Sequence, residues 1–336
     1  MRSDPGIGRG LALCAMAALL GACAVPSNPD RVVAAREAYG QDQDLGLACR
    51  LLMASRCAYA ITATDRLDVN DEGHAWACRA EQDVVERRVF ADGGERINAA
   101  MLERTRGAVI LAFRGTLPPG GGRSDEQILR DWGADLRAEL LKDNAVAGHV
   151  HEGFDKAVHS TLTDVSDVLG QWQREGQLRN KKFYITGHSK GGAMAIIAAT
   201  LLFDTGYRAD AVYTFAAPRA GDTAFETAYA ARRLNVWRYE NRYDVVPHVP
   251  PNAKDDALVA EIFSESFHEG DGRFASVGNL IYIDWSGHLT AAYVGLDEAR
   301  QARFKELILP SRMATALINA HSSSKGDGYG KAVCQE

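Results

Sequence analysis

The stretch that decides the fold runs from Phe183 to Phe203 and is FYITGHSKGGAMAIIAATLLF. It begins with a short apolar run, typical of a buried strand, and ends with a longer apolar run, typical of a helix. Between them, Gly187–Gly191 (GHSKG) has the spacing G-x-S-x-G. A serine on such a sharp turn needs glycine two positions to either side, because bulkier residues would clash. The pattern predicts that Ser189 is a nucleophile at the N-terminus of a helix.

Apolar patterns on either side of this turn predict a mostly parallel sheet. Ala108–Phe113 is a continuous apolar run, which is typical of a strand buried on both faces. From Phe154 to Trp172, apolar residues recur every three or four positions, the spacing of one buried helical face. Further strands are expected at Ala211–Phe215, Leu234–Tyr239 and Asn279–Ile283. Strands that alternate with helices predict an α/β fold with helices on both faces of the sheet.

The bulk composition excludes some classes of protein. The chain has 336 residues, of which 46% are hydrophobic, enough for one large core. Its net charge is −6 and no basic patch stands out, so nucleic acid is not an expected partner. Beyond the N-terminal segment, no run reaches the roughly 18 apolar residues that a membrane-spanning helix needs.

The N-terminus has the features of an export signal. Arg2 and Arg9 precede the apolar run Leu11–Leu20, which is too short for a stable anchor helix. Leu20–Cys23 (LGAC) resembles the lipobox of bacterial lipoproteins. That resemblance implies cleavage before Cys23 and acylation of its thiol, and an ordinary secretory signal cut nearby is the alternative.

These features divide the chain into three parts. We expect a lipoprotein-type signal peptide over residues 1–22, a tether over 23–44 and one folded domain over 45–336. The protein is then exported and lipid-anchored in the cell envelope, at the outer membrane. A periplasmic or secreted protein is the alternative, and a monomer is expected.

Export changes the interpretation of the cysteines. Four remain after the signal peptide and the lipidation site are set aside: Cys49, Cys57, Cys78 and Cys334. An even number in an oxidising compartment predicts two disulfides, with three possible connectivities. Buried free thiols are the alternative. No CxxC pair is present, so a zinc site is not expected.

Six short segments of the chain, taken together and in their order, resemble the segments of a known family. They are Ile110–Thr116 (ILAFRGT), Arg130–Leu136 (RDWGADL), His149–Phe154 (HVHEGF), Gly187–Gly192 (GHSKGG), Thr214–Asp222 (TFAAPRAGD) and Arg238–Pro251 (RYENRYDVVPHVPP). With them the chain resembles the class 3 (fungal-type) lipase family, and the GHSKGG turn resembles bacterial members; Lys190 stands where leucine is more usual. The resemblance covers about residues 45–336. It implies the α/β-hydrolase fold and lipase or esterase activity that requires no metal or organic cofactor.

Asp244 is the residue that best fits the acid of a catalytic triad. A serine hydroxyl needs a base, and the base needs an orienting acid. In this fold the acid and then the histidine follow the serine in the chain. Asp244 comes after the predicted strand Leu234–Tyr239 and before a rigid Val-Val-Pro turn. Asp222 is the rival, but it lies one strand too early and is expected to cap a helix.

Two histidines compete for the role of the base. His288 comes five residues after Ile283 and looks like the histidine segment of fungal family members. His321 lies beyond two helical stretches, and its surroundings resemble the C-terminal histidine segment of bacterial members. Cys334, if disulfide-bonded, would hold this tail in place. We prefer His321 and keep His288 as the alternative, because geometry and not spacing decides.

Two residues are candidates for an oxyanion hole. The N–H of Lys190 follows the nucleophile at a helix N-terminus, where negative charge is favoured. Thr116 is implied by the resemblance, because in the family a hydroxyl residue after Arg-Gly donates through its backbone and side chain. Its alternative role is that of a turn threonine which satisfies nearby backbone groups.

The expected chemistry is acyl transfer, with Ser189 attacking an ester carbonyl. The resemblance implies acylglycerols or phospholipids as substrates. Leu117–Ile128 occupies the place of the family's lid, but it is polar and glycine-rich. A lid that opens onto lipid is expected to have an apolar face, so a short-chain carboxylesterase is one alternative. The other is a non-catalytic surface lipoprotein that uses the fold for binding.

Overall fold

The computed structural model describes most of the chain after residue 43. It describes residues 44–61, 66–68, 74–79, 83–92, 98–117, 140–143, 145–242, 244–252, 273–292, 295–296, 299–300, 302, 310–323 and 328–334. The expected signal peptide, Cys23 and nearly all of the expected tether lie outside these residues, as do residues 118–128 and 130–136. Within the described ranges, no helix has the length and apolar character needed to cross a membrane.

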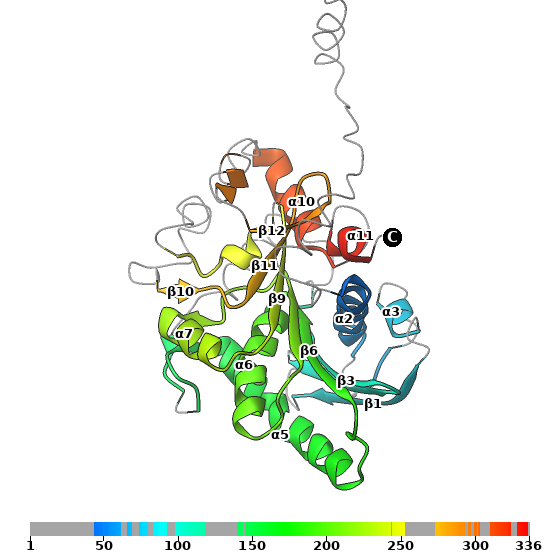
Figure 1. Cartoon of the computed structure of the whole chain (residues 1–336). Coiled ribbons are helices and arrows are strands. Elements are labelled where there is room, and N and C mark those ends of the chain that lie inside the picture. The colour runs from blue at the N-terminus through cyan, green and yellow to red at the C-terminus, as the bar shows by residue number, and fades with distance from the viewer. Residues whose placement is uncertain are drawn as a thin grey trace, which may run out of the picture.

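An eight-stranded sheet forms the centre of the domain (Figure 1). Its strands, in spatial order, are β1 (Val84–Ala91), β2 (Ala99–Thr105), β3 (Ala108–Phe113), β6 (Lys182–His188), β7 (Ala211–Phe215), β9 (Val236–Asn241), β11 (Asn279–Ile283) and β12 (Leu289–Ala291). The strands from β3 to β11 are parallel, and the pairs at both edges are antiparallel. The predicted α/β-hydrolase fold, with its mostly parallel central sheet, is confirmed.

Helices cover both faces of this sheet. The helices are α2 (Leu45–Ala58), α3 (Ala75–Arg79), α5 (Glu152–Arg174), α6 (Lys190–Asp204), α7 (Thr223–Ala231), α10 (Pro310–His321) and α11 (Tyr329–Cys334), with a 3-10 turn at Val246–His248. Figure 1 shows α5 and α6 on one side of the sheet and α2 on the other. In β3, Leu111 packs into the core under α5 and α6, whereas Ile110 and Ala112 pack into the core under α2. This alternation follows from the period of two along a strand.

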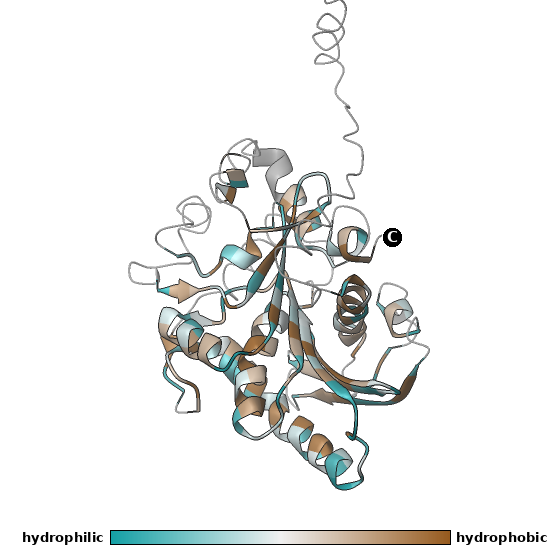
Figure 2. Cartoon of the chain, viewed as in Figure 1, coloured by the Kyte–Doolittle hydropathy of each residue, from teal (hydrophilic) through white to brown (hydrophobic). Residues whose placement is uncertain are grey.

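A small second sheet lies beside α5 and α7. Its strands, in spatial order, are β10 (Phe274–Ala275), β8 (Gly221–Asp222), β5 (Val150–His151) and β4 (Leu140–Leu141). Along α5, Figure 2 shows apolar residues interspersed with polar ones. The buried residues of α5 include Phe154, Val158 and Trp172, the face that the sequence spacing predicted.

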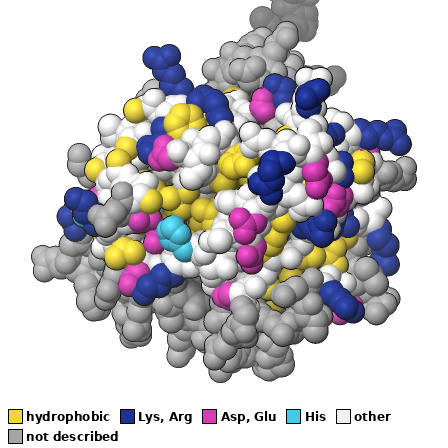
Figure 3. All heavy atoms as spheres, turned by 90° about the horizontal axis from the view of Figure 1, so that it is seen from below, with side chains coloured by type: hydrophobic (Ala, Val, Ile, Leu, Met, Phe, Trp, Pro, Cys, Tyr) yellow, Lys and Arg dark blue, Asp and Glu magenta, His cyan; other side chains and the backbone are white. Residues whose placement is uncertain are grey.

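The surface carries charges of both signs. Figure 3 shows one face of the molecule, on which basic and acidic side chains are interspersed around a band of apolar ones. Such mixing leaves no single-sign field on that face. This arrangement agrees with the absence of a basic patch in the sequence.

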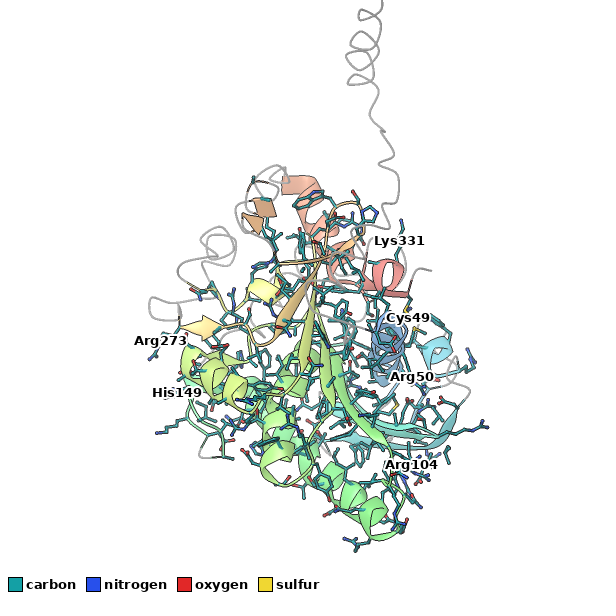
Figure 4. All side chains as sticks on the ribbon, in the orientation of Figure 1. Cys49, Arg50, Arg104, His149, Arg273 and Lys331 are labelled. Carbon is teal, nitrogen blue, oxygen red and sulfur yellow. A yellow bond between two sulfur atoms is a disulfide. The ribbon has the colours of Figure 1, made fainter. Side chains whose placement is uncertain are left out.

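Both predicted disulfides are present. Cys49 of α2 pairs with Cys334 of α11, and Cys57 of α2 pairs with Cys78 of α3. Figure 4 shows Cys49 near Lys331, so the C-terminal helix lies against the first described helix. The sequence predicted two bonds but left their pairing open, and the pairing ties both α3 and α11 to α2.

Candidate active site

The nucleophile turn joins β6 to α6. Ser189 has φ 58° and ψ −135°, a backbone conformation that residues with a side chain rarely adopt. A Cβ atom at Gly187 would lie 2.0 Å from the carbonyl oxygen of Gly191, and one at Gly191 would lie 2.3 Å from that of Phe113. The Ser189 N–H donates to the carbonyl oxygen of Phe215 at 2.9 Å. The glycines therefore give the room that this strained turn requires.

Three of the predicted site residues come together at this turn. Ser189 Oγ lies 2.9 Å from His321 Nε2. On the other side of the same ring, Nδ1 lies 3.0 and 3.1 Å from the two carboxylate oxygens of Asp244. His321 is 5% exposed and Asp244 is 1% exposed. These contacts form a continuous hydrogen-bonded chain from a buried acid to an accessible hydroxyl, which is the arrangement of a serine hydrolase triad.

The alternative histidine, His288, and the rival acid, Asp222, have other partners. His288 lies between β11 and β12, where its Nδ1 is 3.8 Å from Oδ1 of Asp284. Asp222 accepts the Phe225 N–H at 2.8 Å as the N-cap of α7, as the sequence predicted. His149, labelled in Figure 4, adds a contact of 2.9 Å to the same carboxylate. The histidine that contacts Ser189 is therefore His321.

The carboxylate of Asp244 is held by two further donors. The Val246 N–H donates to Oδ1 at 3.0 Å, and the Tyr329 hydroxyl donates to Oδ2 at 2.7 Å. Tyr329 Oη also accepts the Asn241 N–H at 3.0 Å. Burial, followed by the Asp244 charge, raises the pKa of Tyr329, so the phenol stays protonated and keeps donating. A buried carboxylate needs such donors, because desolvation penalises its charge.

His188, next to the nucleophile, contacts the backbone of the triad histidine. Its Nε2 lies 2.7 Å from the carbonyl oxygen of His321, and its Nδ1 lies 2.9 Å from Tyr59 Oη. Burial, followed by repulsion from His321, lowers the pKa of His188 well below its ordinary value. The neutral ring therefore donates from Nε2 and accepts the Tyr59 hydroxyl proton at Nδ1. This pair holds the end of α10 against the nucleophile turn.

The candidate oxyanion residues follow two neighbouring strands at their carboxyl ends. Thr116 is half-buried and follows β3, and Lys190 is the first residue of α6. Between them the backbones approach closely, because a Cβ atom at Gly115 would lie 2.7 Å from the carbonyl oxygen of His188. The Lys190 ammonium donates to Asn98 Oδ1 at 2.6 Å. The lysine side chain thus contacts the start of β2.

A cavity of about 380 Å³ lies elsewhere in the domain. Its lining includes Val109 and Phe183, at the amino ends of β3 and β6, together with Leu169 and Tyr207. Ser189 follows the carboxyl end of β6. Because ligands of open α/β sheets bind at the carboxyl ends of the strands, this cavity is not the catalytic cleft.

Sequence comparisons match the central part of the chain to known lipases. Residues 110–254 match the family model described as lipase (class 3). All six segments quoted above fall inside that range. The comparisons support the class 3 lipase family. The matched range includes Ser189 and Asp244 but ends before either candidate histidine.

Named relatives align with parts of the chain. A lipase of Rhizomucor miehei is 34% identical over 151 residues, which are 43% of this chain and 38% of that protein. Secreted mono- and diacylglycerol lipase A of Penicillium cyclopium is 29% identical over 44% of this chain and 45% of its own. Phospholipase A1-II 6 of Oryza sativa is 26% identical over 60% of this chain and 52% of its own. The chain thus spans about two fifths to one half of these relatives.

Solved structures share the fold. The Rhizomucor miehei triacylglyceride lipase superposes with a TM-score of 0.53 at 24% identity, over 72% of this chain and 81% of that one. A triacylglycerol lipase described by its serine protease triad superposes with a TM-score of 0.54, also at 24% identity, over the same shares of the two chains. At this level of identity the likeness shows the α/β-hydrolase fold.

Sequence reasoning missed three residues around the triad. Tyr329 contacts Asp244 and His188 contacts the backbone of His321. Tyr59 contacts His188, and no spacing rule assigns any of the three a role at the triad. One signal was available for Tyr329, because it lies five residues before Cys334 in a tail that a disulfide was expected to hold.

Proposed function

We propose that the protein is a serine hydrolase that cleaves carboxylic esters through an acyl-enzyme. The observation that carries the proposal is the hydrogen-bonded chain from Asp244 through His321 to Ser189 Oγ, built on a turn with positive φ. A turn serine without a catalytic role needs neither the strained backbone nor a buried histidine–carboxylate pair.

The proposed reaction has two halves. Ser189 Oγ attacks the ester carbonyl while His321 Nε2 takes the hydroxyl proton, and Asp244 stabilises the imidazolium through Nδ1–H. The tetrahedral intermediate expels the alcohol, which receives the proton from His321. Water then attacks the acyl-enzyme with the same base and releases the acid. Backbone and hydroxyl donors at Thr116 and the Lys190 N–H stabilise both oxyanions.

We assign acylglycerols or phospholipids as the substrate class. The support is the class 3 lipase match over residues 110–254, and the relatives' names, which include lipase, diacylglycerol lipase and phospholipase A1. The polar composition of residues 117–128 favours weak activation by lipid surfaces. Comparison of dissolved short-chain and emulsified long-chain esters separates a lipase from a short-chain carboxylesterase.

The decisive experiment replaces the nucleophile. Ser189→Ala should abolish hydrolysis of p-nitrophenyl esters and labelling by a fluorophosphonate probe. Ser166→Ala, on a partly exposed face of α5, is the matched control and should retain both. If wild type and Ser189→Ala are equally inert on every chain length, the protein uses the hydrolase fold for binding alone. Labelling of another residue would remove Ser189 from the mechanism.

We further propose that the mature protein is a monomeric, lipid-anchored domain of the cell envelope. Residues 1–22 act as a signal peptide, Cys23 carries the lipid, residues 23–44 form the tether and residues 45–336 form the catalytic domain. The LGAC motif and the charged, then apolar, N-terminus support this assignment. Cys23→Ser should abolish incorporation of labelled palmitate and release the protein from outer-membrane fractions. If labelling persists in Cys23→Ser, the anchor is wrong, and the periplasmic or secreted alternative replaces it.

A further inference from the structure

Three potential metal ligands meet outside the triad. Asp155 and His159 lie one helical turn apart on α5, and Asp143 lies two residues after β4. One ligand atom from each residue lies within 4.8 Å of the other two. Spacing of four residues on a helix places two side chains on the same face. The third ligand comes from a different segment, so the cluster joins that segment to α5.

Asp155 has a buried oxygen that no hydrogen bond explains. The residue is 4% exposed, and its Oδ1 has no hydrogen-bond partner. This oxygen points into the cluster, because it lies 3.6 Å from His159 Nε2. A buried carboxylate oxygen without a donor is costly.

The spacing of the ligand atoms fits a small tetrahedral cation. His159 Nε2 lies 3.2 Å from Asp143 Oδ2 and 3.6 Å from Asp155 Oδ1. Two ligands of a tetrahedral Zn²⁺ ion, each bonded at about 2.0–2.1 Å, are about 3.4 Å apart. These two distances lie on either side of this value, and the ligand atoms of Asp143 and Asp155 lie within 4.8 Å of each other. A direct hydrogen bond accounts for the 3.2 Å contact, but the 3.6 Å contact is too long to be one.

We propose that Asp143, Asp155 and His159 bind a Zn²⁺ ion, with water as the fourth ligand. One imidazole and two carboxylates are ligands that zinc accepts, whereas Ca²⁺ requires six to eight oxygens and Mg²⁺ an octahedral oxygen shell. The second oxygen of Asp143 already accepts the Ala145 N–H at 2.8 Å, which fixes the orientation of this carboxylate. The bound ion joins Asp143 to α5. This site depends on no part of the proposed hydrolase function.

A titration of the full-length mature protein with ZnCl₂ tests the site. Isothermal titration calorimetry should find one tight site per chain, and free Zn²⁺ at about a hundredfold excess over its Kd should raise Tm by about 4 °C. CaCl₂ and MgCl₂ at the same concentrations should do neither. Co²⁺ in place of Zn²⁺ should give the absorption bands of tetrahedral coordination.

Matched variants separate this site from incidental binding. Asp155→Asn and His159→Gln should each weaken Zn²⁺ binding by at least tenfold and remove the rise in Tm. Asp164→Asn changes an exposed aspartate on the same helix and should bind like wild type. His159 has a side chain that is 48% exposed, so His159→Gln is expected to fold. Equal zinc affinity in wild type, Asp155→Asn and His159→Gln would overturn the site, as would tighter binding of Ca²⁺ than of Zn²⁺.

Discussion

The nucleophile turn and the C-terminal tail contribute to one site by different means. The turn is local, because Ser189 is oriented by glycines within three residues of it and by the strand and helix that it joins. The tail is non-local: His321 ends α10, and its partners His188, Ser189 and Asp244 all lie more than 75 residues away in the sequence. Tyr59, on the N-terminal side, contacts the tail through His188. Short-range sequence patterns therefore encode the nucleophile but not its base.

The tail also depends on a covalent constraint that the turn does not need. Tyr329 begins α11 and contacts Asp244, and Cys334 ends α11 and is bonded to Cys49. Variants in the turn should therefore affect chemistry with little effect on stability. Variants in the tail should affect both, since the same residues order the chain and orient the acid.

Among variants of the C-terminal tail, the largest effect is expected at His321, the proposed base. His321→Ala should lower kcat/KM by about 10⁴–10⁶-fold, because Ser189 then has no proton acceptor. His288→Ala, the matched control, should retain activity within a few fold. Both variants are first checked for a wild-type circular dichroism spectrum. A large loss in His288→Ala with an active His321→Ala would reverse the assignment.

The next largest effect is expected at Thr116, the candidate oxyanion donor that follows the strand beside the nucleophile turn. Thr116→Val removes a hydroxyl and keeps the backbone N–H, and it should lower kcat by about 10²–10³-fold with a small change in KM. Loss of a donor used in the transition state changes kcat more than substrate binding. Thr163→Val, on an exposed position of α5, serves as the control. An unchanged kcat in Thr116→Val would leave Thr116 as a turn residue.

The sequence predicted the central fold well because the central strands are buried on both faces. Continuous apolar runs placed β3, β7 and β11 at the residues where the structure has them. Strands β1 and β2 were not predicted. β1 includes several charged residues, and β2 contains Glu103, which is fully buried and paired with Arg87. Charged residues in these two strands conceal the periodicity that identifies a strand.

The candidate site likewise contains residues that the sequence could select and residues that it could not. Order in the chain and position after a strand were sufficient to select Ser189 and Asp244. His288 and His321 remained alternatives, because both follow the acid and the spacing from the last strand to the histidine is not fixed. Contacts across more than 75 residues, such as those from His321 and Tyr329 to Asp244, favour His321, and they appear only in three dimensions.

A smaller effect is expected at the tyrosine that holds the acid. Tyr329→Phe removes the donor to Asp244 Oδ2 and the acceptor of the Asn241 N–H. Hydrogen bonds to charged groups contribute about 1.5–3 kcal/mol, so kcat should fall by about 10- to 150-fold while KM stays near wild type. Tyr207→Phe, remote from the triad, is the control. If kcat stays at the wild-type value and only Tm falls, Tyr329 acts on the fold and not on Asp244.

The smallest effect on activity is expected from the disulfides, where the two bonds can be compared directly. Cys49 and Cys334 are 285 residues apart, and Cys57 and Cys78 are 21 apart. In the loop-entropy description, the longer loop contributes about 2 kcal/mol more to the free energy of unfolding. The Cys49→Ala/Cys334→Ala variant should therefore lose more Tm than Cys57→Ala/Cys78→Ala. It alone should also lower kcat by a few fold, because α11 then holds Tyr329 less firmly against Asp244. Removing the Cys49–Cys334 bond from Tyr329→Phe should cost little further activity, since both changes act through the same hydrogen bond. Full additivity of the two losses would mean that the bond and the tyrosine act separately.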